Sequence, residues 1–241
     1  MWRRPSCSKL SVIVPGSLLL LSLILGFHNV DSLHAADMPK ILTIEDFSQG
    51  VIGQFPDDWG VWKDRDKNRP NYYTVEEEAG NKFLHADSHD QDIIIGKEFR
   101  WKLKDYPILN FRMRVHAFPP RGDEIDGPVD SAAAIYVVFS QNFFGIPKII
   151  KYVWSSTLPV GTIDRRKKFA RPWIIVVGSG SEKLGEWITV RRNLIEDFDA
   201  TFGGKPADRP KSIGIMSDSE ATNSASIADY DDIWVERLTD Q

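Results

Sequence analysis

Short apolar segments, rich in Val, Ile, Phe, Tyr and Trp, recur along the chain between clusters of Gly, Pro, Asn and Asp. Segments of this length and composition, separated by turn residues, are typical of the strands of a β-sandwich or barrel. We predict eleven strands, over residues 42–47, 72–77, 82–86, 93–101, 108–116, 132–139, 146–154, 173–177, 187–192, 212–216 and 228–238. Residues 78–81, Glu-Ala-Gly-Asn, predict a hairpin between the second and third strands.

One segment has helical spacing instead. Leu194, Ile195, Phe198 and Phe202 recur at intervals of about one turn, and the pair Gly203-Gly204 follows as a stop signal, so we predict a short helix over residues 194–202. The strand over 132–139 is almost wholly apolar, which favours a central position buried on both faces. The fold class is therefore all-β, with one short helix.

The strand around residue 113 alternates apolar and basic side chains. Because side chains on a strand point to opposite faces in turn, Arg112, Arg114 and His116 form a row on one face. Three cationic or titratable groups in a row repel one another unless water or an anion surrounds them. The pattern therefore indicates either a solvated sheet face or a surface for an acidic ligand.

The N-terminus has the three parts of an export signal. Arg3, Arg4 and Lys9 precede an apolar run over residues 10–27, and small residues follow at Ala35 and Ala36. A signal anchor is the alternative, since about 18 apolar residues are just enough to span a bilayer. Pro15-Gly16 weakens a permanent helix and favours cleavage. We expect residues 1–36 to be removed and residues 37–241 to form one domain, periplasmic or secreted and without a membrane span.

Charge and cysteine content narrow the chemistry of that domain. Removing residues 1–36 takes away three basic residues and one acidic residue, so the formal charge falls from −4 to −6. A mildly acidic chain is not expected to bind nucleic acid through phosphate neutralisation. The only cysteine, Cys7, lies within the export signal, so disulfides, thiolate zinc sites and cysteine nucleophiles are excluded. We expect no organic cofactor.

Five segments together resemble one known family. They are KFLHA (82–86), DSAAA (130–134), IPKIIKYVWSSTLP (146–159), IGIMSDS (213–219) and ADYDDI (228–233). With these motifs, nearly the whole domain is similar to the exported bacterial family catalogued as domain of unknown function 3047. That family has no established activity, so the resemblance implies a family but no reaction.

The two ends of the domain carry a looser resemblance. The segments 44–47 and 56–59 at the start and 230–235 at the end are similar to the terminal strands of β-jelly-roll carbohydrate-binding modules. The resemblance implies a single jelly-roll-like β-sandwich in which the first and last strands pair. It also implies that carboxylates beside those strands hold a structural calcium ion. Such an ion takes oxygen ligands, and the preferred candidates are Glu45, Asp46 and Asp231.

We expect a non-catalytic module that binds a glycan or another acidic ligand of the cell envelope. Tryptophan rings near strand ends could serve as flat platforms for sugars. The candidate binding residues are Arg112, Arg114, His116, Trp154 and Trp62.

Two alternatives remain open. A polysaccharide lyase acting on a uronate-containing glycan needs arginines to neutralise the carboxylate, with a histidine or tyrosine as base or acid. The candidate catalytic residues are Arg112, Arg114, His116, Tyr136 and Tyr152. The other alternative is a structural envelope protein without a small ligand, which predicts that the basic row is merely solvated.

Overall fold

The computed structural model describes residues 38–62, 72–141, 146–167 and 171–238. The predicted export signal, residues 1–36, lies outside them. In the described part of the chain, no helix is both long enough and apolar enough to cross a membrane. The elements below belong to one compact unit that includes Ile41–Gln241.

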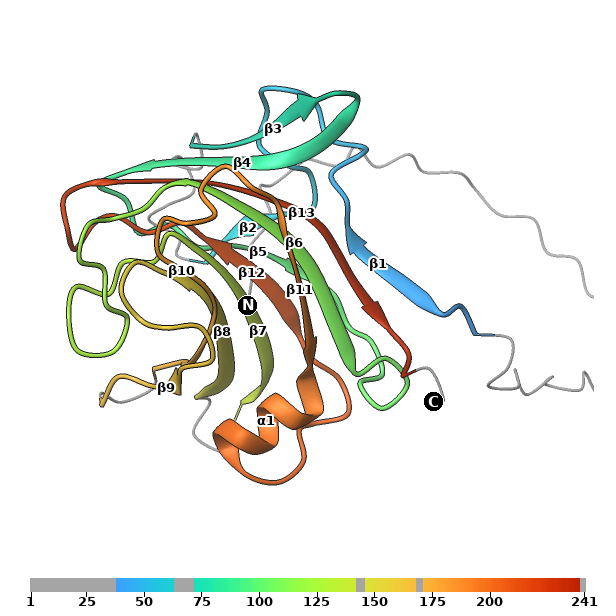
Figure 1. Cartoon of the computed structure of the whole chain (residues 1–241). Helices are drawn as coiled ribbons and strands as arrows, with labels where there is room; N and C mark the ends of the chain where they lie inside the picture. The colour runs from blue at the N-terminus through green and yellow to red at the C-terminus, as the bar shows by residue number, and fades with distance from the viewer. Residues whose placement is uncertain (1–37, 63–71, 142–145, 168–170, 239–241) are drawn as a thin grey trace, which may run out of the picture. The chain divides into compact units, whose positions relative to one another are not determined.

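Two β-sheets face each other, and one short helix closes one end (Figure 1). The first, sheet A, has the strand order β11-β6-β13-β4-β3, and β1 pairs with β13. Its strands are β1 (Ile41–Glu45), β3 (Tyr73–Glu78), β4 (Asn81–His89), β6 (Ile108–Ala117), β11 (Ile188–Asn193) and β13 (Ala225–Glu236). The first and last long strands are therefore antiparallel neighbours, as the resemblance of the termini implied.

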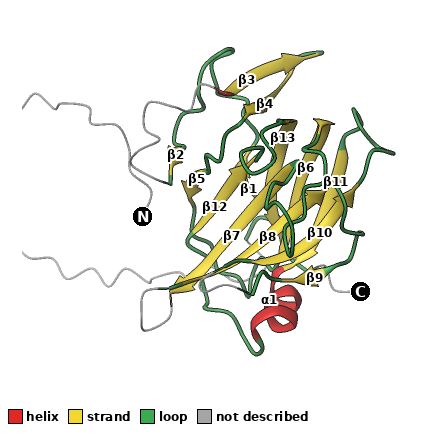
Figure 2. Ribbon diagram, turned by 90° about the vertical axis from the view of Figure 1, so that its left-hand side faces the viewer, coloured by secondary structure: helices red, strands yellow, loops and turns green. Residues whose placement is uncertain are grey.

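The second, sheet B, has the order β2-β5-β12-β7-β8-β10-β9, and its long strands lie side by side in Figure 2. Its strands are β2 (Gly60–Val61), β5 (Ile95–Glu98), β7 (Ala133–Gln141), β8 (Pro147–Ser155), β9 (Ile163–Asp164), β10 (Trp173–Ser179) and β12 (Ser212–Met216). All its pairings are antiparallel except that of β8 with β10. The all-β prediction is confirmed. Only the two-residue strands β2 and β9 lack a predicted counterpart.

The core lies between the sheets, where alternate side chains of both interdigitate. Phe111 of β6 and Tyr152 of β8 meet there, with ring centroids 6.0 Å apart. Tyr230 of β13 bridges the layers, because its hydroxyl donates to the backbone oxygen of Met216 and accepts from the backbone N–H of Ala134. The central position predicted for the strand over 132–139 is confirmed, since β7 lies between β12 and β8 and residues 133–139 are buried.

The helix and the hairpin follow from local chemistry. Helix α1 (Leu194–Phe202) matches the predicted range; the Asn193 side chain accepts from the N–H groups of Ile195 and Glu196, and Gly203 ends the helix with φ of 72°. In the hairpin between β3 and β4, Ala79 and Gly80 both have positive φ, 52° and 83°, as a tight two-residue turn requires.

Candidate functional site

The basic row predicted on β6 exists on the outer face of sheet A. Phe111, Met113 and Val115 are fully buried between the sheets, so Arg112, Arg114 and His116 share the opposite face. This part of the prediction is confirmed. What surrounds the row differs from both alternatives, solvent and an acidic ligand.

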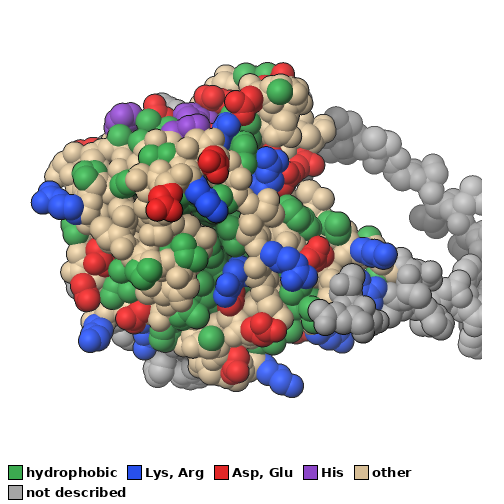
Figure 3. Space-filling view, viewed as in Figure 1, with side chains coloured by type: hydrophobic (Ala, Val, Ile, Leu, Met, Phe, Trp, Pro, Cys, Tyr) green, Lys and Arg blue, Asp and Glu red, His purple; other side chains and the backbone are tan. Residues whose placement is uncertain are grey.

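The partners of the row come from neighbouring strands of the same sheet. Asp229 of β13, only 1% exposed, accepts from Arg114 Nε at 2.7 Å and faces His116 Nε2 at 2.6 Å and His85 Nδ1 at 2.7 Å. Arg112 donates to Asp232 at 2.9 Å. Figure 3 shows histidine side chains next to acidic ones near the position of β4. The chain therefore supplies its own anions to the row.

Trp187, the aromatic side chain beside the row, already packs against other side chains of the protein. The guanidinium carbons of Arg112 and Arg114 lie 4.6 and 4.7 Å from the ring centroid of Trp187, and Phe83 packs against Trp187 edge-on. The predicted platform Trp154 lies elsewhere: it is 1% exposed and its indole N–H donates to the Gly180 carbonyl. The prediction of Trp154 as a platform for a sugar is wrong, because β8 turns this residue into the core.

The shared Asp229 makes stability depend on pH. The pKa of His85 lies above the ordinary value, mainly because of its hydrogen bond to Asp229. A raised pKa in the folded state contributes stability that is complete below the unfolded pKa, about 6.5, and is lost as the pH rises through the folded pKa. We expect the stability difference between the wild type and His85→Gln, measured by urea unfolding, to be larger at pH 6 than at pH 9. An equal difference at both pH values would contradict this.

The constellation predicted for a lyase is not assembled. Tyr152 is buried between the sheets and its hydroxyl donates to Asp197 at 2.7 Å. Burial raises the pKa of Tyr152 well above the ordinary value, which disfavours a tyrosinate base. Tyr136 belongs to the outer face of sheet B, whereas His116 belongs to the outer face of sheet A. Neither tyrosine can assist His116 in moving a proton, so this site prediction is wrong.

The three carboxylates predicted to hold calcium have protein partners. Glu45 accepts from the Trp59 indole and the Lys97 ammonium; Asp46 accepts from the Ser48 N–H; Asp231 accepts from the Asn81 amide. Among the described residues, no three His, Cys, Asp or Glu side chains converge as a metal site. The structural calcium stays a prediction, for which a fall in melting temperature on adding a chelator is the test.

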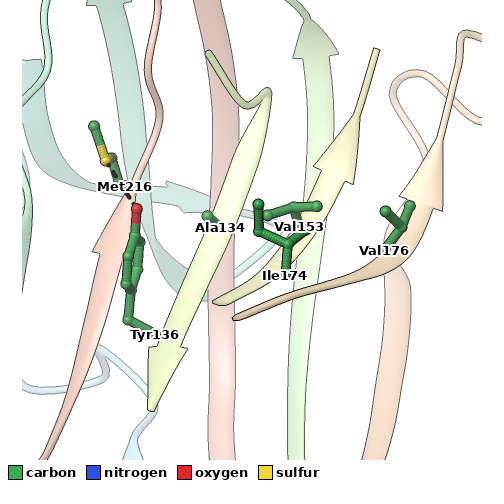
Figure 4. Packing of buried hydrophobic residues seen from close by; sticks show 6 residues of the cluster. All are labelled: Ala134, Tyr136, Val153, Ile174, Val176 and Met216. Atoms are coloured by element: carbon green, nitrogen blue, oxygen red, sulfur yellow. Dashed lines mark hydrogen bonds between the residues drawn. The ribbon is translucent and has the colours of Figure 1, made fainter. Parts of the chain in front are cut away.

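A pocket of about 360 Å³ opens on the outer face of sheet B, the opposite side of the sandwich from the basic row. Beside it lies a cluster of apolar side chains from β7, β8, β10 and β12: Ala134, Tyr136, Val153, Ile174, Val176 and Met216 (Figure 4). The Tyr136 hydroxyl points at the Met216 sulfur, 3.2 Å away. Tyr136, Ile174 and Met216 line the pocket itself. We call this site the sheet B pocket.

A buried ionic cluster forms one part of the pocket wall. Lys151 of β8 pairs with Tyr136 of β7 and is 5% exposed. Its ammonium lies 2.7 Å from the Ser131 hydroxyl. Burial alone would lower the pKa of Lys151, but Tyr136, Glu124 and Asp218 together raise it, so the ammonium stays charged. Glu124 and Asp218, which also line the pocket, are 2% and 6% exposed.

Asp218 has a second carboxylate, Asp130, as a neighbour. Asp130 accepts from the N–H groups of Ala221 and Thr222 and from the Thr222 hydroxyl, so both of its carboxylate oxygens have protein donors. Burial is the main cause that raises the pKa of Asp218 to about 8, and Asp130 adds to it. At neutral pH Asp218 therefore holds its proton. Perturbed acids that line a pocket are a feature of functional sites.

The rim of the pocket carries an aromatic ring and arginines. Trp62, 39% exposed, lines the pocket together with Arg166 and Arg171. Of the residues predicted to bind a glycan, only Trp62 lines this pocket. Of the residues predicted to be catalytic in a lyase, only Tyr136 lines it. Sequence analysis missed Lys151 and Asp218. A lysine inside the apolar run over 146–154 was the available signal, because a charge within a central strand needs a special environment.

Comparisons with known proteins bear on the family and on structural similarity. The chain is similar to a family 11 carbohydrate-binding module of a cellulosomal cellulase of Clostridium thermocellum, at 12% identity over 83% of this chain and 96% of that one, with a TM-score of 0.41. It is similar to TmCBM61 in complex with β-1,4-galactotriose, at 12% identity over 81% and 97%, with a TM-score of 0.38. It is also similar to the K2 cleaved adhesin domain of Lys-gingipain, at 12% identity over 81% of this chain and 97% of that one, with a TM-score of 0.42.

No curated protein sequence matches the chain. A family model does: "Protein of unknown function (DUF3047)" matches residues 57–234, which are most of the chain and include the basic row and the residues that line the sheet B pocket. The family resemblance of the sequence motifs is confirmed. The chain belongs to the DUF3047 family of proteins of unknown function.

Proposed function

We propose that this protein is a non-catalytic glycan-binding module of the periplasm or cell exterior, and that the glycan occupies the sheet B pocket. One observation carries the proposal: an exposed Trp62 and the apolar side chains of Tyr136, Ile174 and Met216 line one pocket together with buried Lys151, Glu124 and Asp218. Flat apolar rings suit the apolar faces of sugars, and a few fixed polar groups suit their hydroxyls.

The basic row supports ligand binding less well. Asp229 and Asp232 already neutralise Arg114 and Arg112, and the two arginines lie against the ring of Trp187. A ligand that binds to the row would have to displace these partners from the two arginines. At the sheet B pocket, Trp62 is 39% exposed, so part of its ring is accessible to a ligand.

The lyase alternative loses its support from geometry. Its arginines and histidine belong to sheet A, whereas Tyr136 belongs to sheet B and Tyr152 is in the core. The structural alternative, an envelope protein without a small ligand, is tested together with the proposal. A glycan array with the purified protein is the direct experiment, and the absence of binding to any glycan would favour the structural role.

Trp62→Ala provides a local test of the site. We expect the affinity for a glycan found on the array to fall about tenfold, because an exposed ring stacked on a sugar contributes roughly 1–2 kcal/mol. Isothermal titration calorimetry measures the change. Val51→Ala is the matched control, since Val51 is 62% exposed and does not line the pocket. An unchanged affinity in Trp62→Ala would remove the pocket from the proposal.

A further inference from the structure

We propose that the sheet B pocket selects an uncharged sugar residue, held through hydroxyl groups that donate to Glu124 and accept from Lys151. This inference rests on the proposed function and names the class of glycan. The basic row led us to expect an acidic ligand. The sheet B pocket favours a different ligand, because its donors, acceptors and charges differ from those of the row.

Glu124 presents an unmet acceptor. Its side chain lines the pocket and is 2% exposed, and its Oε2 atom accepts from the Ser155 hydroxyl at 2.7 Å. Its Oε1 atom is buried and has no hydrogen-bond partner among the described residues. A buried acceptor without a donor is costly, and more so for a charged group. A ligand with a hydrogen to donate would remove that cost.

Lys151 presents the complementary donor. An ammonium carries three N–H bonds and accepts none. Ser131 takes one of them at 2.7 Å, and the remaining surroundings of the ammonium are Tyr136 and the acids of the pocket. Any ligand atom that approaches Lys151 must therefore be an acceptor, whereas any atom that approaches Glu124 must be a donor.

A hydroxyl group satisfies both demands, because it donates one hydrogen and accepts through its lone pairs. A carboxylate accepts from Lys151 but has nothing to donate to Glu124. An ammonium donates to Glu124 but has nothing to accept from Lys151, and the two cations repel. Neighbouring hydroxyls of a sugar ring are thus the ligand groups that match the pair, and a charged group in place of either hydroxyl leaves one partner unmatched.

The charges around the pocket point the same way. Four acidic residues and three basic residues line it: Asp92, Glu124, Asp218, Glu220, Lys151, Arg166 and Arg171. Arg166 donates to the Gly127 carbonyl at 2.9 Å and keeps its charge, whereas Asp218 holds its proton at neutral pH. The lining therefore offers no excess of either charge that would favour a charged sugar.

The test compares three oligosaccharides of equal length: a neutral one, one built of uronates and one built of free amino sugars. Isothermal titration calorimetry on the full protein at pH 7 measures each dissociation constant. We expect the neutral oligosaccharide to bind at least about tenfold more tightly than either charged one. If the uronate binds as tightly or more tightly, the inference fails while the proposed function stands. If nothing binds, the proposed function fails.

A variant localises the selectivity. In Glu124→Gln the shape is kept but the charge-assisted hydrogen bond to the ligand is lost, so we expect about tenfold weaker binding of the neutral oligosaccharide. Glu182→Gln is the control, because Glu182 is exposed and does not line this pocket. An unchanged affinity in Glu124→Gln overturns the assignment. The comparison of the three oligosaccharides on the wild type decides the class of ligand even if the variant fails to fold.

Discussion

Replacement of Lys151 by methionine is expected to lower the free energy of unfolding at pH 7 by about 3–5 kcal/mol, because removal of one partner leaves the buried Glu124 carboxylate uncompensated. Lys151 is 5% exposed and interacts electrostatically with Glu124 and Asp218. Methionine fills much of the same volume, so the loss reports charge rather than packing. Urea unfolding measures the change.

Two further variants separate the causes. Lys183→Met is the control for removing a lysine, since Lys183 is exposed, and it should change stability by less than about 0.5 kcal/mol. In the double variant Lys151→Met with Glu124→Gln, part of the loss should be recovered, because one of the buried acids can no longer carry charge. If Lys151→Met is as stable as the wild type, Lys151 does not stabilise the buried acids Glu124 and Asp218.

Replacement of Asp229 by asparagine is the second large effect, again roughly 3–5 kcal/mol of lost stability. The single carboxylate binds Arg114, His85 and His116 within 2.7 Å, and Arg114 is itself only 9% exposed. Asparagine keeps the shape but cannot balance the charges. Burial alone would raise the pKa of Asp229, but these hydrogen bonds lower it overall, so the wild-type contribution is complete at neutral pH and is lost as the pH falls through the folded pKa.

The readout includes a titration as well as a melting curve. In Asp229→Asn the pKa of His85, followed by nuclear magnetic resonance, should fall from its raised value, since the bond to Asp229 is the main cause of the rise. Asp208→Asn, at an exposed site with a side chain 61% exposed, serves as the control. A His85 pKa that stays raised in Asp229→Asn would contradict the described network.

The strands were predictable because their signals are local. Alternation placed Arg112, Arg114 and His116 on one face, the hairpin at Ala79-Gly80 followed from turn chemistry, and helix α1 followed from apolar spacing and its glycine stop. Each of these depends on residues a few positions apart. The two-residue strands β2 and β9 were missed because two residues carry no periodicity.

The site was less predictable because it depends on partners distant in sequence. The basic row suggested a ligand only as long as its anions were unknown. They come from β13, more than a hundred positions later, and from Glu78 of β3. Lys151 lies on β8, and Asp218 lies 67 positions later, two residues after the end of β12. Only the sheet order brings both to one pocket. Trp154 and Trp62 could not be told apart by composition, yet one is 1% exposed and the other 39%.

We propose that the ligand binds on sheet B rather than on sheet A. A titration followed by nuclear magnetic resonance, with a neutral oligosaccharide added to labelled protein, reports on both faces at once. We predict that the Trp62 indole and the Met216 methyl signals shift, whereas the Trp187 indole signal beside the basic row does not. Shifts at Trp187 with Trp62 and Met216 unchanged would contradict the account and return the binding site to the row of Arg112, Arg114 and His116.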